Sequence, residues 1–188
     1  MQILMLIASL LCIGLIPELN ALPAQVFIIR HAEKPPEGTG LSLKGKERAA
    51  ALVPYFMETK ELIINGTPVA IYAMAAPKED SSVRAIETVR KLADELKITL
   101  NTNYVRDNFK KMVEDIKSNS QYHGKTVLIC WEHDVIPDMA RSFGALQAPF
   151  RWQSEVFDKI WIINFDVATG RSVFQNIPQR LLFGDSNF

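Results

Sequence analysis

Apolar residues gather in short runs that are separated by stretches rich in charge, Gly and Pro. The runs 26–29, 69–73 and 126–131 carry β-branched and aromatic residues, which is typical of strands buried on both faces. Two later runs, 160–165 and 172–174, flank 166–170 and predict a pair of strands joined as a hairpin. The pattern therefore predicts a sheet whose first three strands form the buried centre.

Helical patterns lie between these strands. Ser42 is a suitable N-cap for a helix over 43–53, which Pro54 should bend or end. The alternation of strands and helices predicts a three-layer α/β/α sandwich with a mainly parallel central sheet. The other predicted helices cover about 81–96, 107–116 and 136–143, the first capped by Ser81 or Ser82 and the second by Asp107.

The first 24 residues have a different character from the rest. The stretch 3–16 is apolar except for Ser9 and Gly14, and small residues follow at Ala21 and Ala24. This pattern is typical of a secretory signal peptide, since it is too short for a membrane span of about 20 residues. We therefore expect a leader over 1–24, a single domain over 25–188, and a secreted or periplasmic location without stable membrane insertion. The alternatives are an uncleaved anchor or a buried first helix.

Composition narrows the possible partners. The 188 residues include 21 Lys and Arg and 21 Asp and Glu, so the formal net charge is zero. This balance argues against a nucleic-acid binder that works by bulk basic charge. The 48% of hydrophobic residues argues against a disordered chain.

Two of the three histidines stand two residues after the end of a buried run. Arg30 and His31 follow the first run, and His133 follows the third. Arg84 stands near the start of the helix after the second run. Because parallel strands end at the same edge of a sheet, we expect these side chains to meet there. Two arginines and two imidazoles suit a phosphate dianion, and a neutral imidazole can attack phosphorus to form a phosphohistidine.

These residues stand in segments that resemble those of the histidine phosphatase superfamily, also called phosphoglycerate-mutase-like. The resemblance spans about 26–165 and is carried by Arg30-His31-Ala32-Glu33-Lys34, Leu41-Ser42-Leu43-Lys44-Gly45, Ser82-Val83-Arg84-Ala85-Ile86-Glu87-Thr88, and the strand that ends at His133-Asp134. It implies the phosphoglycerate-mutase-like fold and a site that uses no metal or organic cofactor.

The resemblance also implies roles for the matched positions. His31 would be the nucleophile, and Arg30, Arg84 and His133 would complete the phosphate pocket. Lys34 would either line that pocket or pair with Glu33 on its rim. An acid must protonate the leaving oxygen. Asp134 fits the position that this acid has in the acid phosphatase branch, with Glu33 and Glu132 as rivals.

The predicted function is metal-independent hydrolysis of phosphomonoesters through a phosphohistidine on His31. The stretches 32–83 and 85–132 are too short for a large cap domain. An open pocket would suit a phosphorylated small molecule, an envelope glycan or a phosphoprotein. Three alternatives stay open: a phosphate-binding pseudoenzyme, a phosphoglycerate-mutase-type phosphotransferase, and a metallohydrolase using His31, His133 and a carboxylate.

Overall fold

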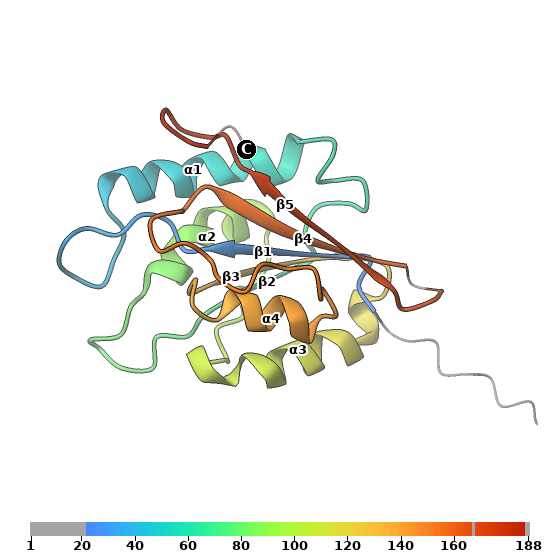
Figure 1. Ribbon diagram of the computed structural model, residues 1–188. Helices are drawn as coiled ribbons and strands as arrows, with labels where there is room; N and C mark the ends of the chain where they lie inside the picture. The colour runs from blue at the N-terminus through green and yellow to red at the C-terminus, as the bar shows by residue number, and fades with distance from the viewer. Residues whose placement is uncertain (1–21, 167, 187–188) are drawn as a thin grey trace, which may run out of the picture.

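The computed structural model describes residues 22–166 and 168–186 and contains a five-stranded sheet with helices on both faces (Figure 1). The predicted leader falls mostly outside the described residues. The strands are β1 (Gln25–Arg30), β2 (Ala70–Ala73), β3 (Thr126–Trp131), β4 (Lys159–Phe165) and β5 (Ser172–Pro178). The helices are α1 (Leu43–Glu58), α2 (Arg84–Glu95), α3 (Phe109–Ser118) and α4 (Ile136–Ser142), with short 3₁₀ turns at Arg106–Asn108 and Ser120–Tyr122.

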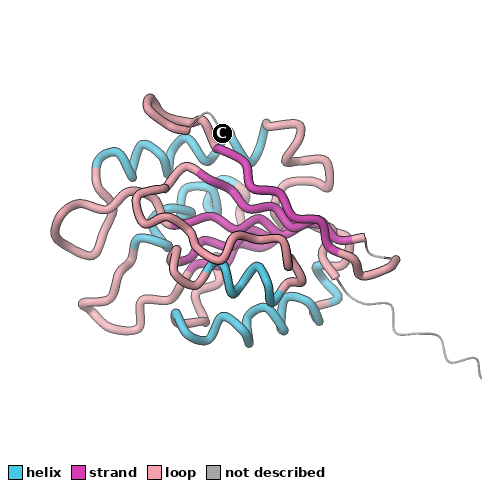
Figure 2. The backbone as a smooth tube through the Cα atoms, viewed as in Figure 1, coloured by secondary structure: helices cyan, strands magenta, loops and turns pink. Residues whose placement is uncertain are grey.

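The strand order in the sheet is β2-β3-β1-β4-β5. β1 pairs in parallel with β3, and β3 pairs in parallel with β2. β4 runs antiparallel to both β1 and β5, which confirms the predicted hairpin. The centre of the sheet is thus parallel, as the buried apolar runs predicted. The carboxyl ends of β1 and β3 lie side by side, and long loops extend beyond that edge (Figure 2).

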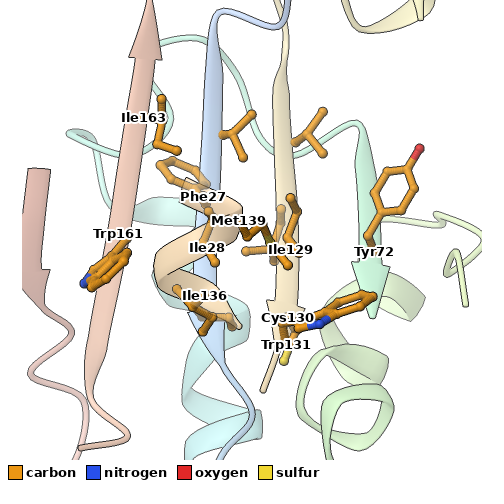
Figure 3. Close-up of a cluster of buried hydrophobic side chains, with 14 of the residues drawn as sticks. Phe27, Ile28, Tyr72, Ile129, Cys130, Trp131, Ile136, Met139, Trp161 and Ile163 are labelled. Carbon is orange, nitrogen blue, oxygen red and sulfur yellow. The ribbon is translucent and has the colours of Figure 1, made fainter. Parts of the chain in front are cut away.

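The helices complete three layers. α1 and α2 pack against each other on one face of the sheet, while α3 and α4 cover the other (Figure 1). β1 and β3 are buried along their whole length because both faces are covered. Figure 3 shows Ile136 and Met139 of α4 lying over Ile28 and Ile129 of the central strands. This confirms the predicted α/β/α sandwich.

The predicted end of the first helix at residue 53 was wrong, because α1 does not end before Pro54. The helix continues to Glu58 with Pro54 inside it. Pro54 lacks the N–H that would bond the carbonyl of Ala50, but both residues are exposed, so water can satisfy that carbonyl. Two residues later Phe56 is fully buried, with its ring 5.4 Å from that of Phe27. Packing at Phe56 therefore outweighs the break that Pro54 introduces.

The predicted caps of the second and third helices were also wrong. The side chain of Ser81 accepts a hydrogen bond from the amide of Lys78, and α2 begins only at Arg84, without a side-chain cap. Asp107 lies in the 3₁₀ turn before α3 and pairs with Arg106 instead. Within the described ranges, no helix is both long and apolar enough to cross a membrane.

Candidate active site

The histidines meet at the carboxyl edge of the sheet. Arg30 is opposite Trp131 in the register of β1 and β3, and the amide of His31 donates to the carbonyl of Trp131 over 3.0 Å. The chain therefore leaves both strands at the same level, and His31 lies beside the segment that carries His133. This confirms that the two strands end together, as their sequences predicted.

The imidazole of His31 is held in one tautomer. Its Nδ1 lies 2.8 Å from the carbonyl oxygen of Ala32. Because a carbonyl only accepts hydrogen bonds, Nδ1 carries the proton and Nε2 keeps its lone pair. Burial lowers the pKa of His31 to about 4, and the charges of Arg30 and Arg84 act in the same direction, against the opposing effect of the Ala32 bond. His31 is therefore neutral at pH 7, with Nε2 available as a nucleophile.

The loop after His31 is fixed by α2. The amide of Ala32 donates to Oγ1 of Thr88 over 2.8 Å, and that hydroxyl donates to the carbonyl of Arg84 over 2.7 Å. Arg84 itself donates from Nε to the carbonyl of Gly40 over 3.1 Å and from Nη2 to that of Gly38. The segment that contains Arg84 thus braces the nucleophile through Thr88, a role that the motif alone did not reveal.

Arg30 is buried and ties a distant loop to the site. Its Nη1 donates to the carbonyls of Ser154 and Val156 over 2.6 and 3.0 Å, and its guanidinium lies 3.8 Å from the centre of the Phe157 ring. Its Nε is buried without a hydrogen-bond partner among the described residues. Burial lowers the pKa of Arg30 to about 10, so it remains charged at neutral pH. A charged group with an unsatisfied buried donor is suited to an oxyanion.

His133 lies at the same edge of the sheet, between the acidic residues Glu132 and Asp134. Its Nε2 is 3.2 Å from Oδ1 of Asp134, and its Nδ1 is buried without a partner in the part of the chain that the structure describes. Burial and the charge of Arg30 lower the pKa of His133. Asp134 is more than half exposed and lies 3.9 Å from Nη2 of Arg106, whereas Glu132 accepts a hydrogen bond from Nε of Arg106 over 2.6 Å. Of these two carboxylates, Asp134 is the less constrained.

The same three consecutive residues could hold a cation. One ligand atom from each of Glu132, His133 and Asp134 lies within 4.8 Å of the others. Neither His31 nor Glu33 belongs to this group. Exposed acidic side chains next to a histidine are also common without a metal, so this arrangement does not by itself define a metal centre.

Glu33 is engaged away from the histidines. Both of its carboxylate oxygens accept from Arg48, at distances of 2.8 to 3.2 Å, and Lys44 lies 3.9 Å away. Arg48 is fully buried and also binds Asp185 over 2.7 Å. Burial would raise the pKa of Asp185, but hydrogen bonds from Arg48 and from the amides of Leu182 and Leu181 lower it to about 2. These contacts favour a structural role for Glu33.

Lys34 is exposed, and no salt bridge joins it to Glu33 among the described residues. It is close enough to His133 for its charge to help lower the pKa of that imidazole. Its position on the rim of the phosphate pocket stays a prediction.

A polar cavity of about 320 Å³ opens beside His133. It is lined by His133, Asp134 and the segment 151–155. Arg30 fixes this segment through the carbonyl of Ser154, and Trp152 does so through a 2.9 Å bond from its Nε1 to the carbonyl of Val156. A phosphate bound by Arg30 and His133 would therefore direct the rest of its molecule toward polar side chains.

Sequence reasoning assigned no role to two arginines of this region, although Arg48 follows the matched segment 41–45. Arg48 stands among Gly45, Ala49, Leu52 and Phe56 on the buried stripe of α1. A charge on an apolar stripe indicates a buried ion pair, so the signal was present. Arg106, which holds Glu132, follows no such pattern because its turn has no regular periodicity.

Comparison with known proteins bears on the fold. No family model and no curated protein matches the sequence. Among solved structures, the protein histidine phosphatase SixA complexed with tungstate superposes with a TM-score of 0.52 at 13% identity, over 82% of this chain and 97% of that one. A phosphoglycerate mutase from Bacillus anthracis gives a TM-score of 0.51 at 14% identity, over 86% and 94% of the two chains. The chain has the histidine phosphatase fold. Both neighbours belong to the superfamily that the motifs resemble, so the predicted phosphoglycerate-mutase-like architecture is confirmed.

Proposed function

We propose that this protein hydrolyses phosphomonoesters through a phosphohistidine on Nε2 of His31. The observation that carries the proposal is the bond from Nδ1 of His31 to the carbonyl of Ala32, because it leaves the other ring nitrogen unprotonated in buried, cationic surroundings. The chain's likeness to SixA, a protein histidine phosphatase, supports the proposal at the level of fold.

The proposed first step is transfer of the phosphoryl group. Arg30, Arg84 and His133 bind the phosphate oxygens, with Lys34 on the rim. Nε2 of His31 attacks phosphorus, a P–N bond forms and the P–O bond to the alcohol breaks. The carboxylic acid of Asp134 gives its proton to the leaving oxygen. Water then attacks phosphorus, the carboxylate takes a proton from that water, and inorganic phosphate leaves His31 free.

Hydrolysis is favoured over mutase chemistry by the absence of a cap within the described chain. The stretch 32–83 contains α1 and β2, and the stretch 85–132 contains most of α2, together with α3 and β3. These elements belong to the sandwich itself and form no cap over the site. The cavity beside His133 is polar and reaches solvent through exposed Asp134. An open, polar cavity beside His133 and Asp134 favours water as the final phosphoryl acceptor, whereas a mutase must keep water out.

The same openness supports a substrate whose phosphate projects from a hydrophilic body. We propose a phosphorylated small molecule, an envelope glycan or a phosphoprotein, met after export by the predicted leader. The polar side chains of 151–155 favour hydroxyl-rich or charged leaving groups over apolar alcohols, because such groups can form hydrogen bonds with them.

The decisive assay is hydrolysis of p-nitrophenyl phosphate from pH 4 to 8 with EDTA present. We expect wild-type activity to survive EDTA, to be inhibited by tungstate, and to vanish in His31→Ala. The third histidine, His123, provides the matched control, because it lies next to the 3₁₀ turn Ser120–Tyr122 and not at the strand ends. Activity in His31→Ala would refute the nucleophile, and loss of activity with EDTA would favour the metallohydrolase.

A second assay identifies the proton donor. An alkyl phosphate needs its leaving oxygen protonated, whereas p-nitrophenolate leaves readily without help. We expect Asp134→Asn to lower kcat on glycerol phosphate by about a hundredfold or more and to affect p-nitrophenyl phosphate far less. If Glu132→Gln shows that pattern and Asp134→Asn does not, the donor is Glu132.

A further inference from the structure

A groove between α1 and α2 lies outside the phosphate pocket. Its volume is about 360 Å³, which falls within the range of small-molecule sites. Its lining includes none of Arg30, His31, Arg84 or His133. The groove is lined by Leu41, Lys46, Ala49, Ile86, Glu87, Arg90 and Lys91.

The floor of the groove is apolar and well fixed. Leu41 and Ala49 are buried and form a small hydrophobic cluster with Ala32, apart from the main core. The amide of Leu41 donates to a carboxylate oxygen of Glu87 over 2.8 Å, which joins the loop before α1 to α2. The half-buried side chain of Ile86 completes the floor. An apolar group placed on this floor would bury surface without any rearrangement.

The rim of the groove is cationic. Lys46, Arg90 and Lys91 are exposed, and none of them takes part in a salt bridge within 22–166 and 168–186. Glu87 is the one acidic residue of the lining, and it keeps its negative charge while one of its oxygens accepts the Leu41 amide, so the lining has three cations and one anion. Three free cations around an apolar floor stand out in a chain whose formal net charge is zero.

We propose that this groove binds a small amphipathic anion, a molecule with an apolar body and one carboxylate, sulfonate or phosphate head. The apolar body packs on Leu41, Ala49 and Ile86, and the head lies among the three cations of the rim. The apolar floor supplies the surface that the ligand buries, and the exposed cations of the rim select an anionic head, each contributing modestly. Ala32 follows His31 in the chain and shares a cluster with Leu41 and Ala49, yet no residue assigned to the phosphate pocket lines the groove.

The test is fluorescence titration of the full chain with 1-anilinonaphthalene-8-sulfonate, which has an aromatic body and a sulfonate. We expect saturable binding at one site. The double variant Lys46→Glu/Arg90→Glu should weaken it about tenfold, since each exposed charge pair contributes modestly. The matched control is Lys110→Glu/Lys125→Glu, which makes the same change of charge at exposed positions elsewhere. Equal affinity in the two double variants would overturn the proposal.

Three competition arms locate the probe and define its chemistry. Decanoate should displace the probe, whereas decanol at the same concentration should not. Tungstate, directed at the phosphate pocket, should leave the probe bound. Displacement by decanol would show that charge plays no part, and displacement by tungstate would place the probe in the phosphate pocket; either result overturns the proposal. None of these readouts needs turnover, so they are independent of the proposed phosphatase activity.

Discussion

A Cβ atom added to Gly45 would lie 2.3 Å from the carbonyl oxygen of Glu33. That carbonyl also accepts the amide of Ser42 over 2.9 Å, and the hydroxyl of Ser42 accepts the amide of Gly45 over 3.1 Å. The first turn of α1 is therefore pressed against the backbone two residues beyond His31. Gly45 is required at this position for its lack of a side chain, and this explains why the motif contains a glycine inside a helix.

We expect Gly45→Ala to destabilise the protein although alanine favours helices. The clash is with backbone, which cannot move aside without displacing the loop that carries His31. The overpacking cost of roughly 1–3 kcal/mol should exceed the helix-propensity gain of about 1 kcal/mol. Urea unfolding measures the difference. The control is Glu47→Ala, an exposed position on the same helix, which should change stability little. Unchanged stability in Gly45→Ala would refute the close approach.

Thr88→Val should impair both stability and catalysis. The substitution keeps the shape of the side chain but removes the oxygen that accepts the buried amide of Ala32. An unsatisfied buried amide costs about 1–3 kcal/mol, and Ala32 is the residue whose carbonyl sets the tautomer of His31. Thr88→Ser keeps the hydroxyl and is the matched control. We expect the valine variant to lose kcat on p-nitrophenyl phosphate and the serine variant to retain most of it; equal activity would show that the brace is dispensable.

The protonation of His31 should occur at unusually low pH. Burial, aided by Arg30 and Arg84, lowers its pKa to about 4, from an ordinary value of 6.5. The neutral ring should therefore persist well below pH 6, and the contribution of His31 to folding stability should fall as the pH drops from 6.5 toward 4, because the unfolded chain binds that proton first. Following the imidazole carbon resonance by NMR measures the value directly. Protonation of His31 near pH 6.5 would contradict the buried, cationic setting.

The strands could be predicted from the sequence because burial on both faces produces unbroken apolar runs. The run 126–131 coincides with β3, and 26–29 falls one residue short of β1 at each end, where Gln25 and Arg30 are polar but buried. The helix boundaries were less predictable. Pro54 and Asp107 carry strong local signals, but burial of Phe56 and pairing of Asp107 with Arg106 override them.

The site residues also divide into those that the sequence could place and those that it could not. His31, Arg30 and His133 could be placed from the sequence because they end parallel neighbouring strands. The engagement of Glu33 could not, since its partners Arg48 and Asp185 come from distant parts of the chain. Local sequence carries no information on which of several carboxylates a buried arginine selects. Glu33 stood beside the nucleophile in sequence, yet its side chain lies against α1 and the C-terminal segment.

Residues 22–24, which the sequence places at the end of the predicted leader, contact the folded domain. Leu22 is buried in the main core, and its carbonyl accepts the amide of Gly124 over 3.1 Å. Ala24 exchanges backbone hydrogen bonds with both Lys125 and Phe165, at 2.9 and 2.8 Å. We expect a chain that begins at Leu22 to be more stable than one that begins at Gln25, by roughly 2 kcal/mol for the buried leucine alone.

Thermal unfolding of these two truncated chains, with Leu22→Ala in the longer one, measures this contribution. The alanine variant should lose most of the difference between the two chains, because it keeps the backbone bonds and removes only the apolar side chain. If the longer chain is the more stable one, cleavage of the predicted leader after Ala21 is favoured over cleavage after Ala24, because only the former leaves residues 22–24 in the mature protein. Equal stability of the two truncated chains would mean that residues 22–24 contribute nothing to the core and would restore the later boundary.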